Sequence, residues 1–305
     1  MGLRIRTNIE SMNAQRFLGR STGEVREAMT KLASGERINK AADDAAGFAV
    51  SENLLADVRS LRMAKKNAMD GISLIQTAES GMTEVNNMLV RLRELAVQAA
   101  SDTIGNRERE YLDKEYLQLK EELDRIANST EFNGTYLLVG DNELPDEMKG
   151  SNKFPLEIQV NKNYFQDLDK TASPVNVIRI DLSDISVYTE GEKSLHLGRG
   201  EEGTRVNRKE NAQNSIGALD GAIQQISKNR AYIGSLQNRL QSTISFLTIQ
   251  TESLSEARSR IRDADFAEET AAWTQASILQ HAGTSVLASA NAQPKIALSL
   301  LNNQG

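Results

Sequence analysis

The chain has 305 residues, a formal net charge of −6 at pH 7, 5% aromatic residues, two histidines and no cysteine. Without cysteine, disulfides, thiolate nucleophiles and thiolate metal sites are excluded, and an acidic chain without a dominant basic stripe is not expected to bind nucleic acid. No run of 18 apolar residues indicates membrane insertion, and the start MGLRIRTNIES does not read as an ordinary signal peptide.

The first segment, about residues 3–33, carries Leu18, Val25 and Leu32 one heptad apart, which predicts a helix with one apolar stripe. Ser34-Gly35 is expected to end this helix, because glycine is favoured just beyond a helix C-terminus. Basic residues outnumber acidic ones in the first forty positions. We interpret this excess as a solvated or inter-subunit helix face, in preference to an arm that binds nucleic acid or membrane.

A long helix is predicted for about residues 44–100. Its stripe has nonpolar residues at every seventh position: Leu61, Ala68, Ile75, Met82, Leu89 and Ala96. Such a ladder must be buried against another helix. Gly71 and Gly81 within it indicate close approach to a neighbouring element. Asp43-Asp44 could be catalytic carboxylates, but at the start of a helix we favour a capping role.

A third helix is expected after Asn106, its predicted N-cap, and its apolar residues step by four and three: Leu112, Tyr116, Leu119, Leu123 and Ile126. Apolar and polar residues then alternate over 154–160 and 178–182, which predicts two half-buried strands. Hairpins and loops are expected over about 134–205. Since residues about 141–200 of this middle region contain no ladder rung, we expect them to lie outside the core and to be replaceable by a short linker.

A second ladder predicts a helix over about 207–262. Its seven rungs are all aliphatic: Leu219, Ile226, Ile233, Leu240, Leu247, Leu254 and Ile261. The two heptad helices, one from each half of the chain, flank a middle region in which apolar and polar residues alternate. This layout indicates a rod whose two chain ends return to the same place, which favours a structural building block over a catalyst.

The last segment, from Ala271 to Gly305, has Lys295 as its only formal charge. A lone helix of this kind is marginal in water, so it needs partners. It could fold back on its own domain, but the N-terminal segment is also amphipathic. We therefore expect the two chain ends to pair and to pack against other subunits, through Leu18, Val25, Leu32, Leu279, Val286 and Leu300.

Residues that could carry chemistry are few. His196 and His281 stand apart, and the chain contains no H-E-x-x-H motif, no phosphate-binding loop and no dinucleotide-binding glycine motif. We predict no catalytic residue, no cofactor and no metal site, and hence no enzyme. Trp273 could stack on a ligand, but we interpret it as a subunit-packing residue.

Four segments resemble bacterial flagellin: SGERINKAADDAAGFAVSE (34–52), LVRLRELAVQAASD (89–102), LDRIANSTEFNGTYLL (123–138) and ILQHAGTSVLASANAQPKIALSLL (278–301). The resemblance covers about residues 1–140 and 207–305. Since only residues 141–206 separate the two helical halves, the chain looks like a short flagellin without large outer domains.

The resemblance implies a mainly α fold: a long antiparallel α-helical rod, similar to a coiled-coil bundle, with a small β-hairpin region in the middle and paired N- and C-terminal helices. Residues 1–43 and 263–305 would be the two halves of an inner-tube helical domain. Residues 44–262 would form the rod domain, which includes the hairpin and loop region at 134–205.

The function that the resemblance implies is that of a structural subunit. It would polymerise with itself into the helical flagellar filament for swimming motility. It would be exported through the flagellar secretion channel and lie outside the cell. The implied partners besides further copies are an export chaperone, the filament cap and the hook-junction proteins.

Two other functions are weighed against this one. A flagellar hook–filament junction protein shares the terminal motifs and differs mainly in the middle region. An enzyme carried on the filament would need a site in the central region, such as a metal site. The isolated His196 argues against such a site.

A receptor contact also rests on the resemblance alone. In flagellins sensed by the vertebrate Toll-like receptor for flagellin, an Arg, a Leu and a Glu form the contact centre. The matching positions here are Arg91, Leu95 and Glu115. Leu95 could instead belong to subunit packing, and Arg91 and Glu115 could be solvated charges.

Overall fold

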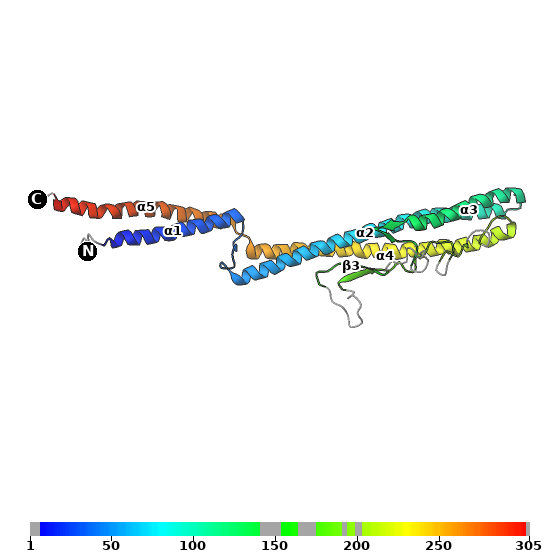
Figure 1. The fold of residues 1–305 in the computed structure, drawn as a ribbon, viewed down its shortest axis with the longest axis horizontal. Coiled ribbons are helices and arrows are strands. Elements are labelled where there is room, and N and C mark those ends of the chain that lie inside the picture. The colour runs from blue at the N-terminus through cyan, green and yellow to red at the C-terminus, as the bar shows by residue number, and fades with distance from the viewer. Residues whose placement is uncertain (1–6, 141–153, 164–174, 191–193, 199–202, 303–305) are drawn as a thin grey trace. The chain divides into compact units, whose positions relative to one another are not determined.

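The computed structural model describes residues 7–140, 154–163, 175–190, 194–198 and 203–302 (Figure 1). The elements in chain order are α1 (Ile9–Ser34), α2 (Ala45–Ala100), α3 (Asn106–Ser129), β1 (Glu131–Phe132), β2 (Thr135–Tyr136), β3 (Leu156–Gln159), β4 (Val177–Ile180), α4 (Lys209–Arg262) and α5 (Phe266–Asn302). The predicted fold class is confirmed: a mainly α chain with long packed helices and small antiparallel hairpins.

The chain divides into two compact units. The terminal unit consists of Met1–Val58 and Glu252–Gly305, and the central unit consists of Arg59–Thr251. Each unit therefore contains part of α2 and part of α4. The predicted boundaries at 43/44 and 262/263 follow the helix ends instead, and the assignment of the outer segments to an inner tube stays a prediction.

The ladders form the core of the central unit, where α2 and α4 lie side by side (Figure 1). The rungs of α2 from Leu61 to Ala96 are at most 1% exposed, and those of α4 from Leu219 to Leu247 are at most 2% exposed. Arg93 of α2 forms an ion pair with Asp220 of α4 at 2.6 Å, and Leu240 lies beside Gly71, so the two helices run antiparallel. The ladder prediction is confirmed for these rungs, whereas Leu254 and Ile261, in the terminal unit, are only half-buried.

The two glycines of α2 provide the close approach that the sequence indicated. A Cβ atom at Gly71 would lie 2.3 Å from Cδ1 of Ile158 on β3 and 3.5 Å from Cδ1 of Leu240. One at Gly81 would lie 2.7 Å from Cδ1 of Leu138. The glycines thus allow the hairpin segments to pack directly on the α2 backbone.

The helix and strand predictions hold, with corrections at two helix starts. The first helix, expected from about residue 3, begins at Ile9, and residues 3–6 lie outside the described residues. The second correction is at the start of α3. Gly105 occupies the N-cap, and Asn106 is the first helical residue. The predicted cap at Asn106 was therefore wrong, because its side-chain oxygen accepts a hydrogen bond from Arg109 at 2.8 Å instead. Asn133 and Gly134, both with positive φ, form the β1–β2 turn. The predicted strands appear as the antiparallel pair β3–β4.

The expectation that the middle region lies outside the core was wrong. Eight of its described apolar residues belong to the same core as the ladder rungs: Val160, Ile178, Ile180, Leu182, Ile185, Val187, Leu195 and Leu197. We call the described residues of 182–206 the strap. A linker cannot replace these side chains without exposing the flank of the helices that they cover.

The strap is held by buried polar side chains on α3. The Asp113 carboxylate accepts hydrogen bonds from the backbone N–H of Val206 at 2.9 Å and from the Arg205 guanidinium at 2.7 Å. The Asp124 carboxylate accepts from the backbone N–H of Thr189 at 3.0 Å. These bonds satisfy strap backbone groups that would otherwise be buried without partners.

Lys120 completes this arrangement. Its ammonium group donates to the backbone carbonyls of Leu197 at 3.2 Å and Thr204 at 3.1 Å and lies 5.9 Å from the centre of the Tyr116 ring. Burial lowers the pKa of Lys120 from 10.5 to about 8, against the attraction of Asp124 and Asp113. The folded chain therefore releases this proton at a lower pH than the unfolded chain does.

Truncation of a ladder rung should destabilise the central unit. Leu240→Ala is expected to cost about 2–5 kcal/mol of unfolding free energy, because it leaves a cavity at a fully buried site. Phe246→Ala is the matched control on the same helix, since Phe246 is 63% exposed, and it should change stability by less than about 0.5 kcal/mol. Urea denaturation of the two variants measures both; equal losses would contradict the burial of the rung.

The titration of Lys120 should appear in the stability of the chain. Between about pH 8 and pH 10.5 the unfolded state holds one more proton than the folded state at this residue. The contribution of Lys120 to the free energy of unfolding therefore rises with pH, by about 3 kcal/mol over the whole interval. In Lys120→Met this contribution should vanish. Urea denaturation at several pH values compares the two slopes, and identical slopes would show that Lys120 does not titrate in this range.

Candidate functional site

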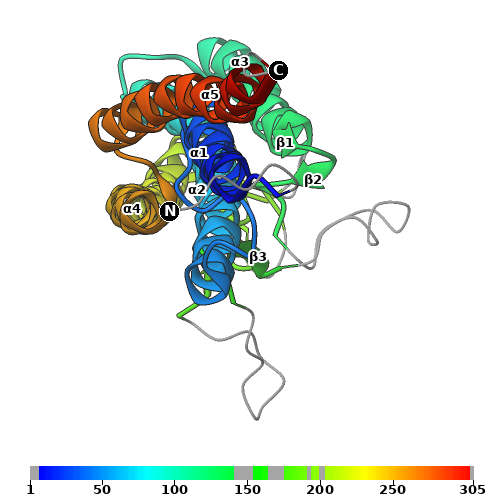
Figure 2. The same cartoon turned by 90° about the vertical axis from the view of Figure 1, so that its left-hand side faces the viewer.

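The terminal unit contains two antiparallel helices, α1 and α5, that lie side by side (Figures 1 and 2). Side chains of α1 and of its N-cap residue, Asn8, contribute to their alignment, as does Gln280 of α5, which donates to the Thr22 hydroxyl at 3.3 Å. Asn8 donates a hydrogen bond to the carbonyl of Ala290 at 2.8 Å, and Ser21 donates to the carbonyl of Ala276 at 2.9 Å. Ser11 donates to the side-chain oxygen of Asn291 at 2.7 Å.

The contact between α1 and α5 is made by small residues. The described side chains of the pair that are buried are Ser11, Ala14, Ser21 and Ala28 on α1 and Ala276 and Ala290 on α5. Near the other end, Lys31 forms ion pairs with Glu27 at 3.1 Å and Glu269 at 3.4 Å. Partial burial by itself lowers the pKa of Lys31, but its contacts with Glu27 and Glu269 raise the pKa overall.

Eight large apolar side chains of the pair point away from this contact. They are between 50% and 69% exposed: Ile9, Met12, Phe17, Met29, Phe266, Ile278, Leu279 and Val286. This is the reverse of a soluble helix pair, in which large apolar residues lie between the helices. A surface of this kind is typical of a site that another protein chain covers.

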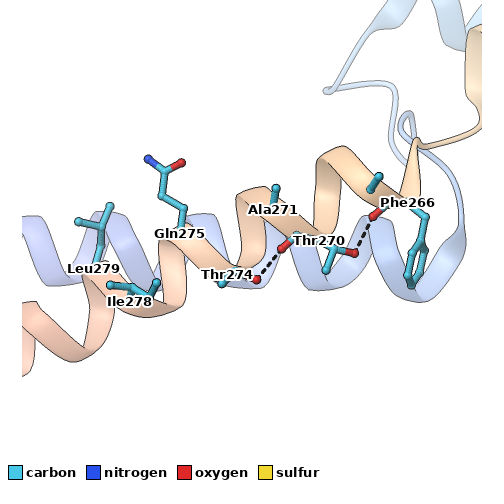
Figure 3. Close-up of a pocket in the computed structure, with 8 residues that line it drawn as sticks. Phe266, Thr270, Ala271, Thr274, Gln275, Ile278 and Leu279 are labelled. Atoms are coloured by element: carbon cyan, nitrogen blue, oxygen red, sulfur yellow. Dashed lines mark hydrogen bonds between the residues drawn. The ribbon is translucent and has the colours of Figure 1, made fainter.

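One groove on α5 shows this surface in detail (Figure 3). It has a volume of about 810 Å³ and is lined by residues that include Phe266, Ile278 and Leu279. Two threonines lie between them, and their hydroxyl groups donate to α5 carbonyls: Thr270 to Phe266 at 2.6 Å and Thr274 to Thr270 at 2.8 Å. Because these hydroxyl groups are already bonded, the groove offers mainly apolar contact.

The predicted packing residues fall into three groups. Leu18, Val25 and Leu32 are half-buried, Leu279 and Val286 are 50% and 58% exposed, and the side chain of Leu300 lies outside the described residues. Their role between subunits stays a prediction. Sequence reasoning missed Phe17, Met29 and Ile278, although each is a large apolar residue on a helix surface. Trp273 is half-buried, and its indole N–H has no hydrogen-bond partner among the described residues.

A junction, residues 35–44, connects α1 to α2 within the terminal unit. Gly35 caps α1 with φ 71°, and its carbonyl accepts from the backbone N–H of Ala264 at 3.0 Å. The backbone N–H of Arg37 donates to the carbonyl of Arg262 at 2.6 Å. The connection before α2 is thus bonded to the connection after α4, although the two are more than 200 residues apart.

Arg262 is the central side chain at this junction. Its side chain is 12% exposed, its Nε atom lies 2.9 Å from Oε1 of Glu36, and its Nη1 atom bonds to Glu52. The guanidinium also lies 5.3 Å from the centre of the Phe48 ring. The contacts with Glu52 and Glu36 raise the pKa of Arg262, so the charge persists at any physiological pH.

The paired aspartates have structural contacts. The Asp44 carboxylate accepts from the backbone N–H groups of Ala46 and Gly47 at 3.1 and 2.9 Å, which confirms the predicted capping of α2. Asp43 accepts from the backbone N–H groups of Lys40 and Asn39 at 2.9 and 3.0 Å, and these bonds lower its pKa.

The residues of the expected receptor contact lie in the central unit, and they separate into two environments. Arg91 and Glu115 are on the surface, where the guanidinium and carboxylate of the two residues approach to 2.8 Å across α2 and α3. Arg91 also pairs with Glu94 at 3.1 Å. Leu95, in contrast, is 1% exposed and belongs to the core. The geometry therefore brings together Arg91 and Glu115 and places Leu95 beneath the surface.

The part of the chain that the structure describes contains no group of three or more histidine, aspartate or glutamate side chains arranged to hold a metal ion. His196 and His281 are both exposed. Among the same residues, no helix is long and apolar enough to cross a membrane.

Two family profiles match the chain. They describe the bacterial flagellin N-terminal helical region, over residues 5–143, and the bacterial flagellin C-terminal helical region, over residues 216–301. A flagellin of Halalkalibacterium halodurans is 39% identical over 297 residues, which cover 97% of this chain and 99% of that protein. The chain belongs to the bacterial flagellin family. It is a short family member without a large outer domain, as the resemblance implied.

Two further proteins place this flagellin among its relatives. The flagellar filament 33 kDa core protein of Treponema phagedenis is 37% identical over 297 residues and matches over 97% of this chain and 99% of its own. A solved structure of a putative flagellar hook-associated protein from Vibrio parahaemolyticus has a TM-score of 0.55 and 13% identity, and it covers 72% of this chain and 100% of that one. At that identity the likeness concerns the fold alone.

Proposed function

We propose that this flagellin is the structural subunit of a bacterial flagellar filament and that it polymerises with further copies of itself for swimming motility. The observation that carries the proposal is the exposure of the large apolar side chains on α1 and α5. Full burial of one such side chain contributes about 1.5–3 kcal/mol, and a lone chain forgoes roughly half or more of this at each of these positions, which are 50–69% exposed. Polymerisation would recover that free energy.

The small-residue contact between α1 and α5 supports the same proposal. It joins the two chain ends into one body while it leaves both outer faces available to neighbours. A subunit that uses different faces toward the copies on either side forms an open array and not a closed ring, unless the rotation between copies closes. The membership in the flagellin family is consistent with a helical filament.

A hook–filament junction protein is the alternative that shares these terminal helices. Its support here is a likeness of fold to one hook-associated protein at 13% identity. The identity of 39% to a flagellin over nearly the whole chain favours the filament subunit.

The location and the other partners are inferred from family membership. We place the assembled subunit outside the cell, after export through the flagellar secretion channel. The partners proposed on the same ground are an export chaperone, the filament cap and the hook-junction proteins. The unpaired apolar faces of α1 and α5 would need protection by such a chaperone before assembly.

A charge on the exposed face of α5 should stop assembly without unfolding the chain. Val286 is 58% exposed, so Val286→Asp should leave the melting temperature of the monomer unchanged. Burial of the unpaired carboxylate against a neighbour should slow filament elongation at least about tenfold. Val286→Leu is the matched control and should elongate normally. Seeded polymerisation followed by sedimentation measures both; normal elongation of Val286→Asp would remove this face from the subunit contact.

Recognition by the vertebrate Toll-like receptor for flagellin is a further proposal, centred on Arg91 and Glu115. An arginine held by a carboxylate presents its remaining donors in a fixed orientation, as a receptor contact requires. Leu95 would support the site from below, since it is only 1% exposed.

Loss of this surface pair should weaken the receptor response. Arg91→Ala should raise the half-maximal concentration in a receptor-reporter cell assay about tenfold, because arginine contacts dominate many interfaces. Its melting temperature should be nearly unchanged, since exposed ion pairs contribute little to stability. Arg107→Ala, at another exposed arginine, is the control. An unaltered response for Arg91→Ala would exclude this contact.

A further inference from the structure

A groove on the surface of the central unit lies between α2 and the end of β3. It has a volume of about 600 Å³, and its lining includes Arg59, Ser60 and Met63 of α2 and Asn161 and Lys162 of the segment that follows β3. None of these five residues belongs to the buried core that the ladders form. The groove is therefore a surface feature and not part of the packing that holds the helices together.

Hydrogen bonds fix the walls of this groove. The side-chain amide of Asn67 on α2 donates to the backbone carbonyl of Gln159 at 3.2 Å, which ties the end of β3 to the helix. The side-chain amide of Gln159 donates to the carbonyls of Asn161 and Asn163, both at 2.8 Å, and so fixes the turn after β3. A ligand would thus meet a preformed surface, which lowers the entropic cost of binding.

Cations follow one face of α2 along the groove. Over residues 58–69 this helix carries four basic residues and no acidic one. Arg59, Arg62 and Lys66 are exposed, and they make no ion pair with any residue that the structure describes. At 3.6 residues per turn and about 1.5 Å per residue, the three lie within about 60° around the helix axis and span about 10 Å along it. They can therefore meet several negative charges of one extended ligand.

The groove also offers groups that suit a sugar ring. The hydroxyl group of Ser60 and the side-chain N–H groups of Asn161 make no hydrogen bond within the described residues. The side chain of Met63 is 57% exposed and supplies an apolar surface. A sugar ring has hydroxyl groups around its edge and C–H groups on its faces, so it needs both kinds of contact. A small number of polar groups around an apolar surface is typical of ligand sites.

We propose that this groove binds an acidic oligosaccharide. Arg59 pairs with a carboxylate inside the groove, and Arg62 and Lys66 pair with carboxylates on sugar units that extend along α2. Ring hydroxyl groups bond to Ser60 and Asn161 at the groove walls. Guanidinium groups suit this role, because their planar donors match the geometry of a carboxylate. The site lies wholly within the central unit, so the inference does not depend on assembly.

The combination of groups favours an acidic sugar over other ligands. A simple polyanion would use the cations but would leave Ser60, Met63 and Asn161 without a role, and a neutral sugar would leave the cations without one. Carboxylates on the same helix limit the site. Asp57 is half-buried before the basic stretch, and Asp70 is exposed after it, so the stretch covers about two turns.

Calorimetric titration of the full-length monomer tests the class of ligand. The acidic probe is trigalacturonate, and the neutral control is its trimethyl ester, which has the same rings without charge. Inorganic tripolyphosphate supplies charge without a ring. At low salt, trigalacturonate should bind at least about tenfold more tightly than the ester. High salt should weaken its binding, since salt screens exposed charges.

Two double variants separate the charge from the sugar contacts. Arg59→Gln with Lys66→Gln should weaken the binding of trigalacturonate at least about tenfold. Ser60→Ala with Met63→Ala should weaken it at least about threefold and leave the binding of tripolyphosphate unchanged. Circular dichroism melting checks that each variant is folded.

A charge-matched control excludes a general effect of lost positive charge. Arg107→Gln with Lys114→Gln removes two exposed cations on α3, outside the groove, and should bind trigalacturonate as the wild type does.

The outcomes are distinct. Equal affinities for trigalacturonate and its ester, no binding of either at millimolar concentration, or normal binding by Arg59→Gln with Lys66→Gln overturn the inference. If Ser60→Ala with Met63→Ala binds trigalacturonate normally, or loses both probes equally, the groove is a general anion site and the assignment to a sugar fails. Because every measurement uses the monomer, these failures leave the proposed function untouched.

Discussion

The contact between α1 and α5 buries serine and alanine, and the properties of the terminal unit depend on the small size of these side chains. Small residues let the two helix backbones approach closely, and the hydrogen bonds from Asn8, Ser11 and Ser21 fix the alignment. The cost is that such a contact buries little apolar area and so contributes little free energy. The large side chains, from Phe17 to Val286, remain on the outside. A single chain therefore leaves these large apolar side chains of the helix pair uncovered.

The central unit has the opposite arrangement, because its large apolar side chains lie mainly between its helices. Its ladders bury aliphatic side chains between α2 and α4. The flank of these helices is covered by α3 and the strap. There, buried carboxylates and Lys120 bond to the strap backbone. The apolar seam provides stability, and the polar contacts determine where an otherwise irregular segment lies.

Sequence periodicity predicted the ladders well, because a seven-residue repeat requires helix packing whatever the surroundings. It failed for the strap. The apolar residues of the strap lie in an irregular segment whose described residues form no helix or strand after residue 182. Its partners on α3 are Asp113, Lys120 and Asp124, which look like a solvated face when read alone. A signal was present: with Tyr116 these residues follow the same steps of three and four as the apolar face of α3. The prediction of Asn106 as the N-cap of α3 failed for a local reason, because its side-chain oxygen accepts a hydrogen bond from Arg109.

The assembly surface was foreseen only in part. The heptad residues Leu279 and Val286 drew attention to α5, and both are exposed. Phe17 and Ile278 each lie one residue before that register, so periodicity did not select them. Met29 lies four residues after Val25 and three before Leu32, so the same period could have included it. Whether an apolar residue faces a partner helix or solvent depends on which face the small residues occupy. Serine and alanine carry too weak a hydrophobic signal to reveal that face from sequence.

The hydrogen bonds between α1 and α5 are asymmetric in a way that bears on sequence drift. Asn8 and Ser21 donate from their side chains, whereas the acceptors on α5 are the backbone carbonyls of Ala290 and Ala276. Every amino acid possesses such a carbonyl, so at these two bonds α5 contributes nothing that a substitution could delete, provided that the new side chain is small. At these two points the alignment is therefore encoded in the α1 segment, whereas the bonds from Ser11 to Asn291 and from Gln280 to Thr22 need a side chain on each helix. At Ala276 and Ala290, any small side chain on α5 would therefore keep the alignment of the two helices.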